Sequence, residues 1–118
     1  MSLITIDLEN NPNLHFRIDN FTVPDGAREE FEDAMRRNLT FLQGLPGFRG
    51  HVVFEKTGGP TTFNLVTIAV WESKEALDKA GEQVRAHYKT IGFDPPAMLA
   101  RWGARAELGN FNAPRGMQ

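Results

Sequence analysis

The stretch Phe63-Asn64-Leu65-Val66-Thr67-Ile68-Ala69-Val70-Trp71, followed at once by Glu72-Ser73-Lys74-Glu75-Ala76-Leu77, decides the fold. Most of its first nine residues are β-branched or aromatic, which predicts a strand, and Ser73 is a typical N-cap for a helix. Successive side chains of a strand point to opposite faces, and both faces are largely apolar here. One face carries Phe63, Leu65, Thr67, Ala69 and Trp71; the other carries Asn64, Val66, Ile68 and Val70. We therefore expect both faces of this strand to be covered.

Composition limits the choice of architecture and partners. The chain has 118 residues, of which 41% are hydrophobic, enough for one compact domain. Its 13 Lys and Arg against 15 Asp and Glu give a net charge of −2, so it lacks the basic excess expected of a nucleic-acid-binding protein. It has no cysteine, no apolar run near the roughly 20 residues of a membrane span and no basic-then-apolar leader. We expect a cytoplasmic protein with neither nucleic-acid nor membrane partners.

The N-terminal part divides into an extension and a strand. Residues 1–13 are expected to be an extension that forms an accessory edge strand or remains mobile. A strict alternation begins at Leu14 and predicts the first strand of the domain. Leu14, Phe16, Ile18 and Asn20 lie on one face; His15, Arg17, Asp19 and Phe21 lie on the other.

The remaining elements follow from apolar spacing and from turn residues. Steps of three or four between apolar residues predict a helix over 27–43, with Asp25 as its N-cap. A strand over 48–55 is expected to pair with the opening stretch through a Gly-Gly turn. The second helix should run from Ser73 to Gly92. A short helix from Asp94 to Gly103 should precede a last strand over 104–108, although one long strand over 97–108 is the alternative.

This order predicts an α+β domain over 14–111, with 112–118 as a C-terminal tail. Strand, helix, strand, strand, helix, strand is the split βαββαβ order of ferredoxin-like folds, a four-stranded antiparallel sheet with helices on one face. The other face would then expose Val66, Ile68 and Val70, together with Val53 and Phe21, a patch larger than monomers usually tolerate. We expect a second copy of the chain to cover it, giving a homodimer through the open sheet face.

Three motifs in this order resemble the antibiotic biosynthesis monooxygenase family of the dimeric α/β barrel superfamily. They are Leu45-Pro46-Gly47-Phe48 after the first helix, the Gly-Gly hairpin, and Val70-Trp71-Glu72-Ser73 before the second helix. The resemblance covers about residues 14–111. It implies a dimeric α/β barrel with a cavity for a small apolar or aromatic ligand between sheet and helices in each subunit.

The resemblance also implies a chemistry. Members of the family oxidise phenolic or quinol-like substrates with O2 without flavin or metal, so we expect no cofactor. Such enzymes carry an Asn four positions before the strand-end Trp, a Tyr six positions after it, and an Arg further along. This chain keeps Trp71 but has Thr67, Leu77 and Ile91 at the other positions. A non-catalytic or isomerase-like dimeric binding protein is therefore the alternative, and an interaction module using the open sheet face is a third hypothesis.

The candidate catalytic residues are Trp71, His51 and Asn20, and the candidate substrate-binding residues are Asn64, Thr67, His87 and Tyr88. Each also has a purely structural interpretation, because large aromatics usually pack in cores and polar residues often cap or pair. His87 and Tyr88 are adjacent on one helix, so at most one should line the cavity. The three His are far apart in sequence, which predicts no metal site. A haem-degrading branch of the superfamily carries a Trp in its second helix, and this chain has none there.

Overall fold

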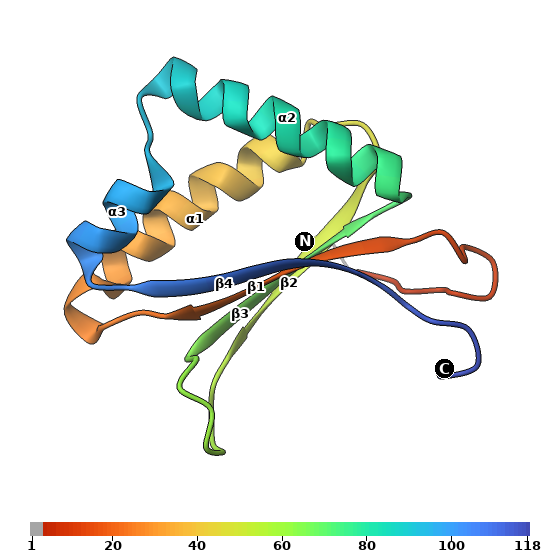
Figure 1. Cartoon of the computed structure of the whole chain (residues 1–118), viewed down its shortest axis with the longest axis horizontal. Coiled ribbons are helices and arrows are strands. Elements are labelled where there is room, and N and C mark those ends of the chain that lie inside the picture. The colour runs from red at the N-terminus through yellow and green to blue at the C-terminus, as the bar shows by residue number, and fades with distance from the viewer. Residues whose placement is uncertain (1–3) are drawn as a thin grey trace.

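The computed structural model describes residues 4–118 and contains one four-stranded sheet and three α-helices (Figure 1). The elements follow one another as β1 (His15–Thr22), a 3-10 turn (Asp25–Ala27), α1 (Arg28–Leu42), β2 (Phe48–Glu55), β3 (Leu65–Trp71), α2 (Lys74–Ile91), α3 (Pro95–Trp102) and β4 (Arg105–Asn112). This is the predicted order, and the α+β fold class is confirmed.

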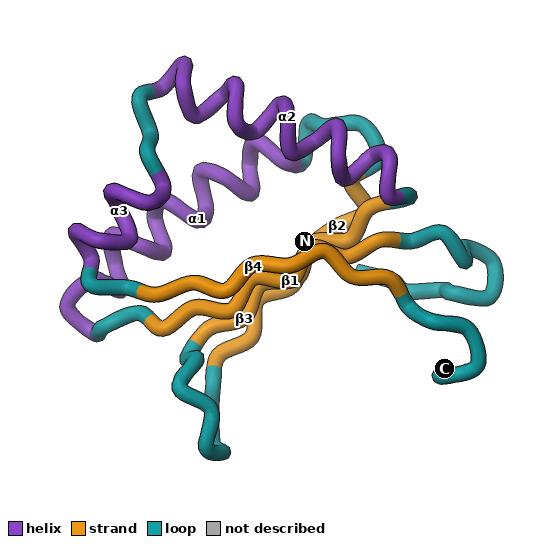
Figure 2. Tube along the Cα trace, viewed as in Figure 1, coloured by secondary structure: helices purple, strands orange, loops and turns teal. Residues whose placement is uncertain are grey.

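The sheet is antiparallel throughout and has the strand order β2-β3-β1-β4. Figures 1 and 2 show α1 and α2 side by side over one face of it, with α3 beside the start of α1. The two central strands, β1 and β3, are each paired on both sides. Side chains that point from these strands toward the helices therefore form the floor of the domain.

Local signals explain most of the helix boundaries. The Ser73 hydroxyl accepts a hydrogen bond from the Ala76 N–H at 3.1 Å, and α2 ends at Gly92 in the left-handed conformation. Asp94 caps α3 in the same way through the Ala97 N–H. The prediction for Asp25 is wrong, because it starts the 3-10 turn and α1 begins after Ala27 without a side-chain cap.

The strand register and the position of α3 correct further expectations. Val53 pairs with Thr67, and Phe21 pairs with Leu65, so both lie on the face that the helices cover, not on the open face. Residues 105–112 form one strand that pairs with the whole of β1, so β4 runs beyond the predicted end at 108. The alternative of a strand over 97–108 is wrong, because α3 occupies its first half.

Residues 4–13 of the N-terminal extension pack on the outer face of the sheet, away from the helices. Ile4 and Leu8 contact a buried cluster of Leu14, Phe16 and Val70. Residues 4–13 form turns and no strand, so the expected accessory strand is absent from the described part of the extension. This segment covers the end of the outer face where β1 begins and β3 ends.

On the helix-covered face the apolar core is split between two ends. One cluster joins Val23, Phe31, Leu65 and Trp102 near the start of α1. The other joins Leu42, Trp71, Leu77 and Ala80 near the start of α2. The space between the two clusters is not filled by side chains, and the candidate site lies there.

Candidate functional site

A cavity of about 800 Å³ lies between the sheet and the helices. Strands β1, β2 and β3 form its floor, and α1 and α2 form its roof. Leu108 on the edge strand β4 also lines it and is 57% exposed, so the cavity is open to solvent at that edge. A cavity of this size matches the pockets that hold small organic ligands.

Small residues make the cavity possible. Ala69 contributes the shortest apolar side chain of the floor, and Ala34, Ala80 and Gly81 line the roof. Phe31 and Trp102 close one end, while Trp71 and Leu42 close the other. The hollow therefore has the shape of a slot between two packed aromatic ends.

The floor carries polar groups in two neighbouring rows. Arg17 of β1 and His51 of β2 both pair with Ala69 of β3, so the three residues form one row across the sheet. Asp19 pairs with Thr67 in the next cavity-facing row. Directly opposite residues of antiparallel strands have Cβ atoms about 4.5–5.5 Å apart, so each row brings its side chains together at the cavity floor.

Arg17 and Asp19 form an ion pair inside this site. The Arg17 Nε donates to Asp19 Oδ1 at 2.6 Å, and the two side chains are 36% and 22% exposed. Burial raises the pKa of the Asp19 carboxyl, and the hydrogen bond and positive charge of Arg17 oppose that rise. The carboxylate is thus a stronger base than an exposed aspartate.

Neither Arg17 nor Asp19 is among the candidates chosen from sequence. The alternation of β1 places these two charged residues on one strand face with Phe21. Only the structure shows that the helices cover this face, because Phe21 packs against Phe31 of α1. Charges on the core-facing side of a central strand are expensive unless they are paired. A charged pair on the helix-covered face of β1 therefore makes Arg17 and Asp19 candidates for the ligand site.

Tyr88 of α2 lines the same cavity. Burial raises the pKa of its phenol, and the negative charge of Asp19 raises it further, while Arg17 acts in the opposite direction. The phenol therefore stays protonated at neutral pH and is available as a hydrogen-bond donor near the floor.

His51 and Trp71 present buried nitrogen atoms that no described residue satisfies. Trp71 is 2% exposed and packs edge-on against Phe48, with ring centroids 5.1 Å apart. Its Nε1 has no hydrogen-bond partner among residues 4–118, and the same holds for His51 Nδ1. Buried polar atoms usually find a partner, so both nitrogens are candidates for contact with a ligand or with water.

The structure brings four of the seven candidates together, namely His51, Thr67, Trp71 and Tyr88. The other three lie elsewhere. Asn20 follows the outward alternation of β1 and lines a small hollow with Phe54 and Asn64 instead. His87 stacks on Phe41, with ring centroids 3.9 Å apart, and does not line the cavity.

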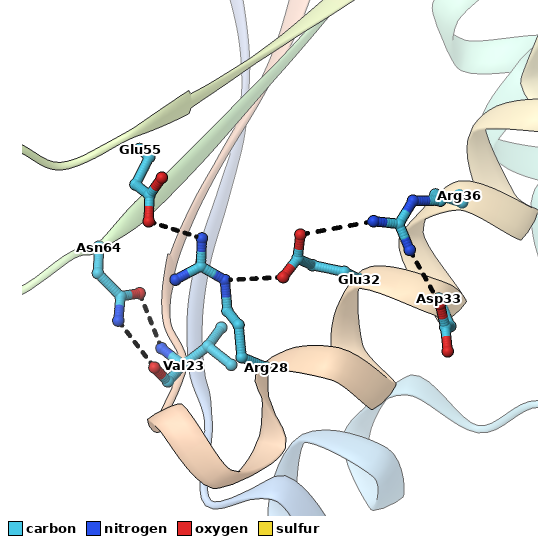
Figure 3. Close-up of polar contacts among 7 residues, drawn as sticks. All are labelled: Val23, Arg28, Glu32, Asp33, Arg36, Glu55 and Asn64. Carbon is cyan, nitrogen blue, oxygen red and sulfur yellow. Dashed lines mark hydrogen bonds and ion pairs between the residues drawn. The ribbon is translucent and has the colours of Figure 1, made fainter.

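Asn64 has a structural contact that explains it. Figure 3 shows its side chain paired with the backbone of Val23: Oδ1 accepts from the Val23 N–H at 2.9 Å, and Nδ2 donates to the Val23 carbonyl at 2.7 Å. This pair fastens the chain after β1 to the chain before β3. A run of ion pairs in the same view links Glu55 of β2 to α1, through Arg28, Glu32, Arg36 and Asp33, and none of these residues lines the cavity.

Two further features bear on ligands and location. Residues 4–118 contain no group of three His, Cys, Asp or Glu side chains placed to hold a metal ion. No helix in that part of the chain combines the length and apolar character needed to cross a membrane.

The fold and the cavity define a ferredoxin-like α+β protein with a ligand-sized internal pocket in each chain. Comparison with known protein families shows to which family the chain belongs. The model of the antibiotic biosynthesis monooxygenase family matches residues 15–89, more than half of the chain, and the protein belongs to that family. Among functionally curated proteins none matches its sequence.

Solved structures agree with this assignment. SnoaB from Streptomyces nogalater, a cofactor-independent oxygenase, is 30% identical, with 89% of this chain and 97% of that chain covered and a TM-score of 0.63. A candidate monooxygenase from Shewanella loihica PV-4 is 16% identical, with coverages of 87% and 96% and a TM-score of 0.67. A protein from Nitrosomonas europaea, described as an antibiotic biosynthesis monooxygenase, is 18% identical, with coverages of 90% and 95% and a TM-score of 0.62. The last two show likeness of fold alone.

Proposed function

We propose that the protein is a cofactor-independent monooxygenase that oxidises a small aromatic or quinol-like substrate with O2. The observation that supports this most is the pairing of an apolar cavity with a polar floor next to Trp71, in a family member 30% identical to the oxygenase SnoaB. An apolar pocket excludes water, and its few polar groups fix the orientation of the ligand.

The reaction balances without an added reductant. A phenol that gains one oxygen atom at a ring carbon and becomes a quinone loses four electrons and two hydrogen atoms. One O2 accepts the four electrons, places one oxygen atom in the product and leaves the other as water. The protein has to hold the ionised phenol next to O2, stabilise the charge and handle protons, which are tasks for side chains.

The candidate residues fit these tasks. The Trp71 N–H and the Tyr88 hydroxyl are donors that can bind substrate oxygen atoms, and Thr67 adds a hydroxyl on the floor. His51 can take the ring proton when water leaves, because a ring nitrogen of neutral imidazole accepts a proton. Where enzymes of this family are expected to carry Asn and Tyr, Thr67 and Leu77 line this cavity, so one of the two positions keeps a polar group and the other is apolar.

Oxygen consumption tests the proposal. Air-saturated protein should consume O2 in excess of buffer with at least one member of a panel of anthrones and hydroquinols, in a ratio of one O2 per quinone formed and without hydrogen peroxide. The matched control is Ala69→Leu, whose side chain occupies the floor between Arg17 and His51, and it should return the rate to that of buffer. Rates equal to buffer across the whole panel would rule the activity out.

A homodimer through the outer face of the sheet is part of the proposal. Phe54 is 53% exposed on that face, and its neighbours Val66 and Ile68 are only half-buried. Light scattering should give twice the mass of the chain, and Phe54→Glu should shift the equilibrium toward monomer. Monomeric wild-type protein at micromolar concentration would contradict this part.

A dimeric binding protein is the second candidate. It is favoured by Leu77, a buried apolar residue that lines the cavity where a catalytic Tyr is expected. Its signature would be tight binding of an aromatic ligand in air with no O2 uptake and no isomerised product.

A further inference from the structure

We propose that Asp19 and Arg17 together ionise the substrate, with Asp19 taking the proton from a phenolic hydroxyl and Arg17 then stabilising the phenolate. This rests on the proposed function and extends it, because it names the base and the class of substrate, a phenol that binds over Ala69 and Thr67. Neither Asp19 nor Arg17 is among the candidate residues that the sequence indicated.

The geometry of the ion pair leaves polar atoms of both residues available to a ligand. Arg17 contacts Asp19 through Nε and Oδ1 at 2.6 Å. No described residue hydrogen-bonds to Asp19 Oδ2, so a carboxylate oxygen remains available to accept from a ligand hydroxyl. Arg17 likewise has no other hydrogen bond among the described residues, which leaves its two terminal nitrogens free to donate.

The position of Asp19 distinguishes it from the other carboxylate that lines the cavity. Asp19 is the carboxylate on the cavity floor, in the row directly opposite Thr67, whereas Asp94 lines the exposed mouth and caps α3. Arg17 lies one row along, beside Ala69, and the short Ala69 side chain leaves room for a ring above it. A phenol lying on Ala69 would bring its oxygen toward the unbonded Oδ2 of Asp19 and the terminal nitrogens of Arg17, with the ion pair itself intact.

Proton transfer from a phenol to Asp19 moves a negative charge within the site without adding one. Before proton transfer, the carboxylate of Asp19 balances Arg17. After transfer, Asp19 is neutral and the phenolate balances the same guanidinium. The number of buried charges does not change, so the ionised substrate forms without the large desolvation cost of a new isolated charge. Burial of Asp19 brings its basicity closer to that of the phenol and so favours this exchange.

Other titratable groups face the same space and have to be considered. They are His51 on β2, Arg85, Tyr88 and Lys89 on α2, and Asp94 before α3. Arg85, Lys89 and Asp94 are exposed at the mouth, where water screens them. His51 lies across Ala69 from Arg17, so it can exchange the ring proton while Asp19 handles the hydroxyl proton.

A binding experiment with 2-hydroxyanthraquinone tests the pair independently of oxygenation. This planar phenol is already a quinone, and its visible absorption changes when it ionises, so the apparent pKa of the bound probe can be titrated. In Asp19→Asn the unpaired guanidinium should lower that pKa by about one or more pH units relative to wild type. In Arg17→Gln the remaining carboxylate should raise it.

Asp78→Asn is the matched control, because Asp78 is an exposed aspartate of α2 outside the cavity. It should leave the apparent pKa of the bound probe unchanged. Opposite shifts in the two cavity variants support the proposal. Shifts no larger than that of Asp78→Asn would overturn it, as would failure of the folded wild type to bind the probe. If the shifts appear but no substrate consumes O2, the ionising pair stands and the monooxygenase proposal fails.

Discussion

Arg17 and His51 lie on opposite sides of Ala69, in one row that crosses three neighbouring strands. The side chain between Arg17 and His51 in this row is therefore only the methyl group of Ala69. A bulkier residue at position 69 would occupy the place where a ligand ring can lie. A substitution there therefore tests directly whether the ligand binds on the cavity floor.

Replacing Ala69 with Leu should abolish ligand binding while leaving the fold intact. The new side chain enters a cavity of about 800 Å³, so its cost should stay well below that of overpacking a filled core. That cost is usually about 1–3 kcal/mol. Fluorescence titration with 2-hydroxyanthraquinone and urea unfolding would measure the two effects. The control is Ala86→Leu on the exposed side of α2, which should bind normally, and normal binding by Ala69→Leu would contradict the placement of the site.

Replacing Trp71 with Phe separates its packing role from a role in chemistry. Phe keeps an aromatic ring against Phe48 but removes the N–H that has no described partner, so the unfolding free energy should fall by less than about 1.5 kcal/mol. If that N–H binds the substrate, kcat/KM for O2 uptake should fall by about tenfold, the equivalent of one hydrogen bond. Trp71→Ala should instead destabilise the protein by about 3–5 kcal/mol. Unchanged turnover in the Phe variant would leave Trp71 as a wall residue.

Much of the fold was predictable because it depends on local signals. Ser73 and Asp94 cap the helices that they were expected to cap, and the alternation of β3 sorts Thr67 and Trp71 onto the cavity face. The end of β4 was not predictable in this way. Gly109 and Asn110 are poor strand formers, and they are held in a strand by pairing with Ile18 and Arg17 of β1.

The candidate site was only partly predictable, for a related reason. Sequence alternation separates Asp19 from Asn20 but does not say which of the two faces the helices cover. The nearness of Asp19 to Thr67 and of Arg17 to His51 depends on strand register, which comes from long-range pairing. Asn64 was chosen for its amide group, and its contact with the Val23 backbone depends on the same register.

Gly47 should tolerate no side chain, because two effects combine at this position. It has a φ of +83°, and an added Cβ would lie 2.6 Å from the Cβ of Ala76 in α2. Gly47→Ala should therefore lower the unfolding free energy by two contributions. The unfavourable backbone conformation costs about 1–3 kcal/mol, and overpacking against Ala76 costs about 1–3 kcal/mol more. The control is Gly59→Ala, which has a φ of +92° but nothing within 4 Å and should show the backbone cost alone. Equal losses in urea unfolding would mean that α2 moves to accept the methyl group.

Asp19→Asn should change the pH dependence of stability in a defined direction. Burial raises the pKa of Asp19 in the folded protein above its value in the unfolded chain, so between these two values the folded state binds more protons than the unfolded state. The contribution of Asp19 to stability is therefore complete below the unfolded pKa, near ~3.9, and is lost as pH rises through the folded pKa. The asparagine variant lacks this loss, and all other carboxylates are common to both proteins. The unfolding free energy of Asp19→Asn minus that of wild type should consequently increase from pH 4 to pH 7. Urea unfolding at both pH values measures the difference, and a decrease would show that the ion pair with Arg17 outweighs burial.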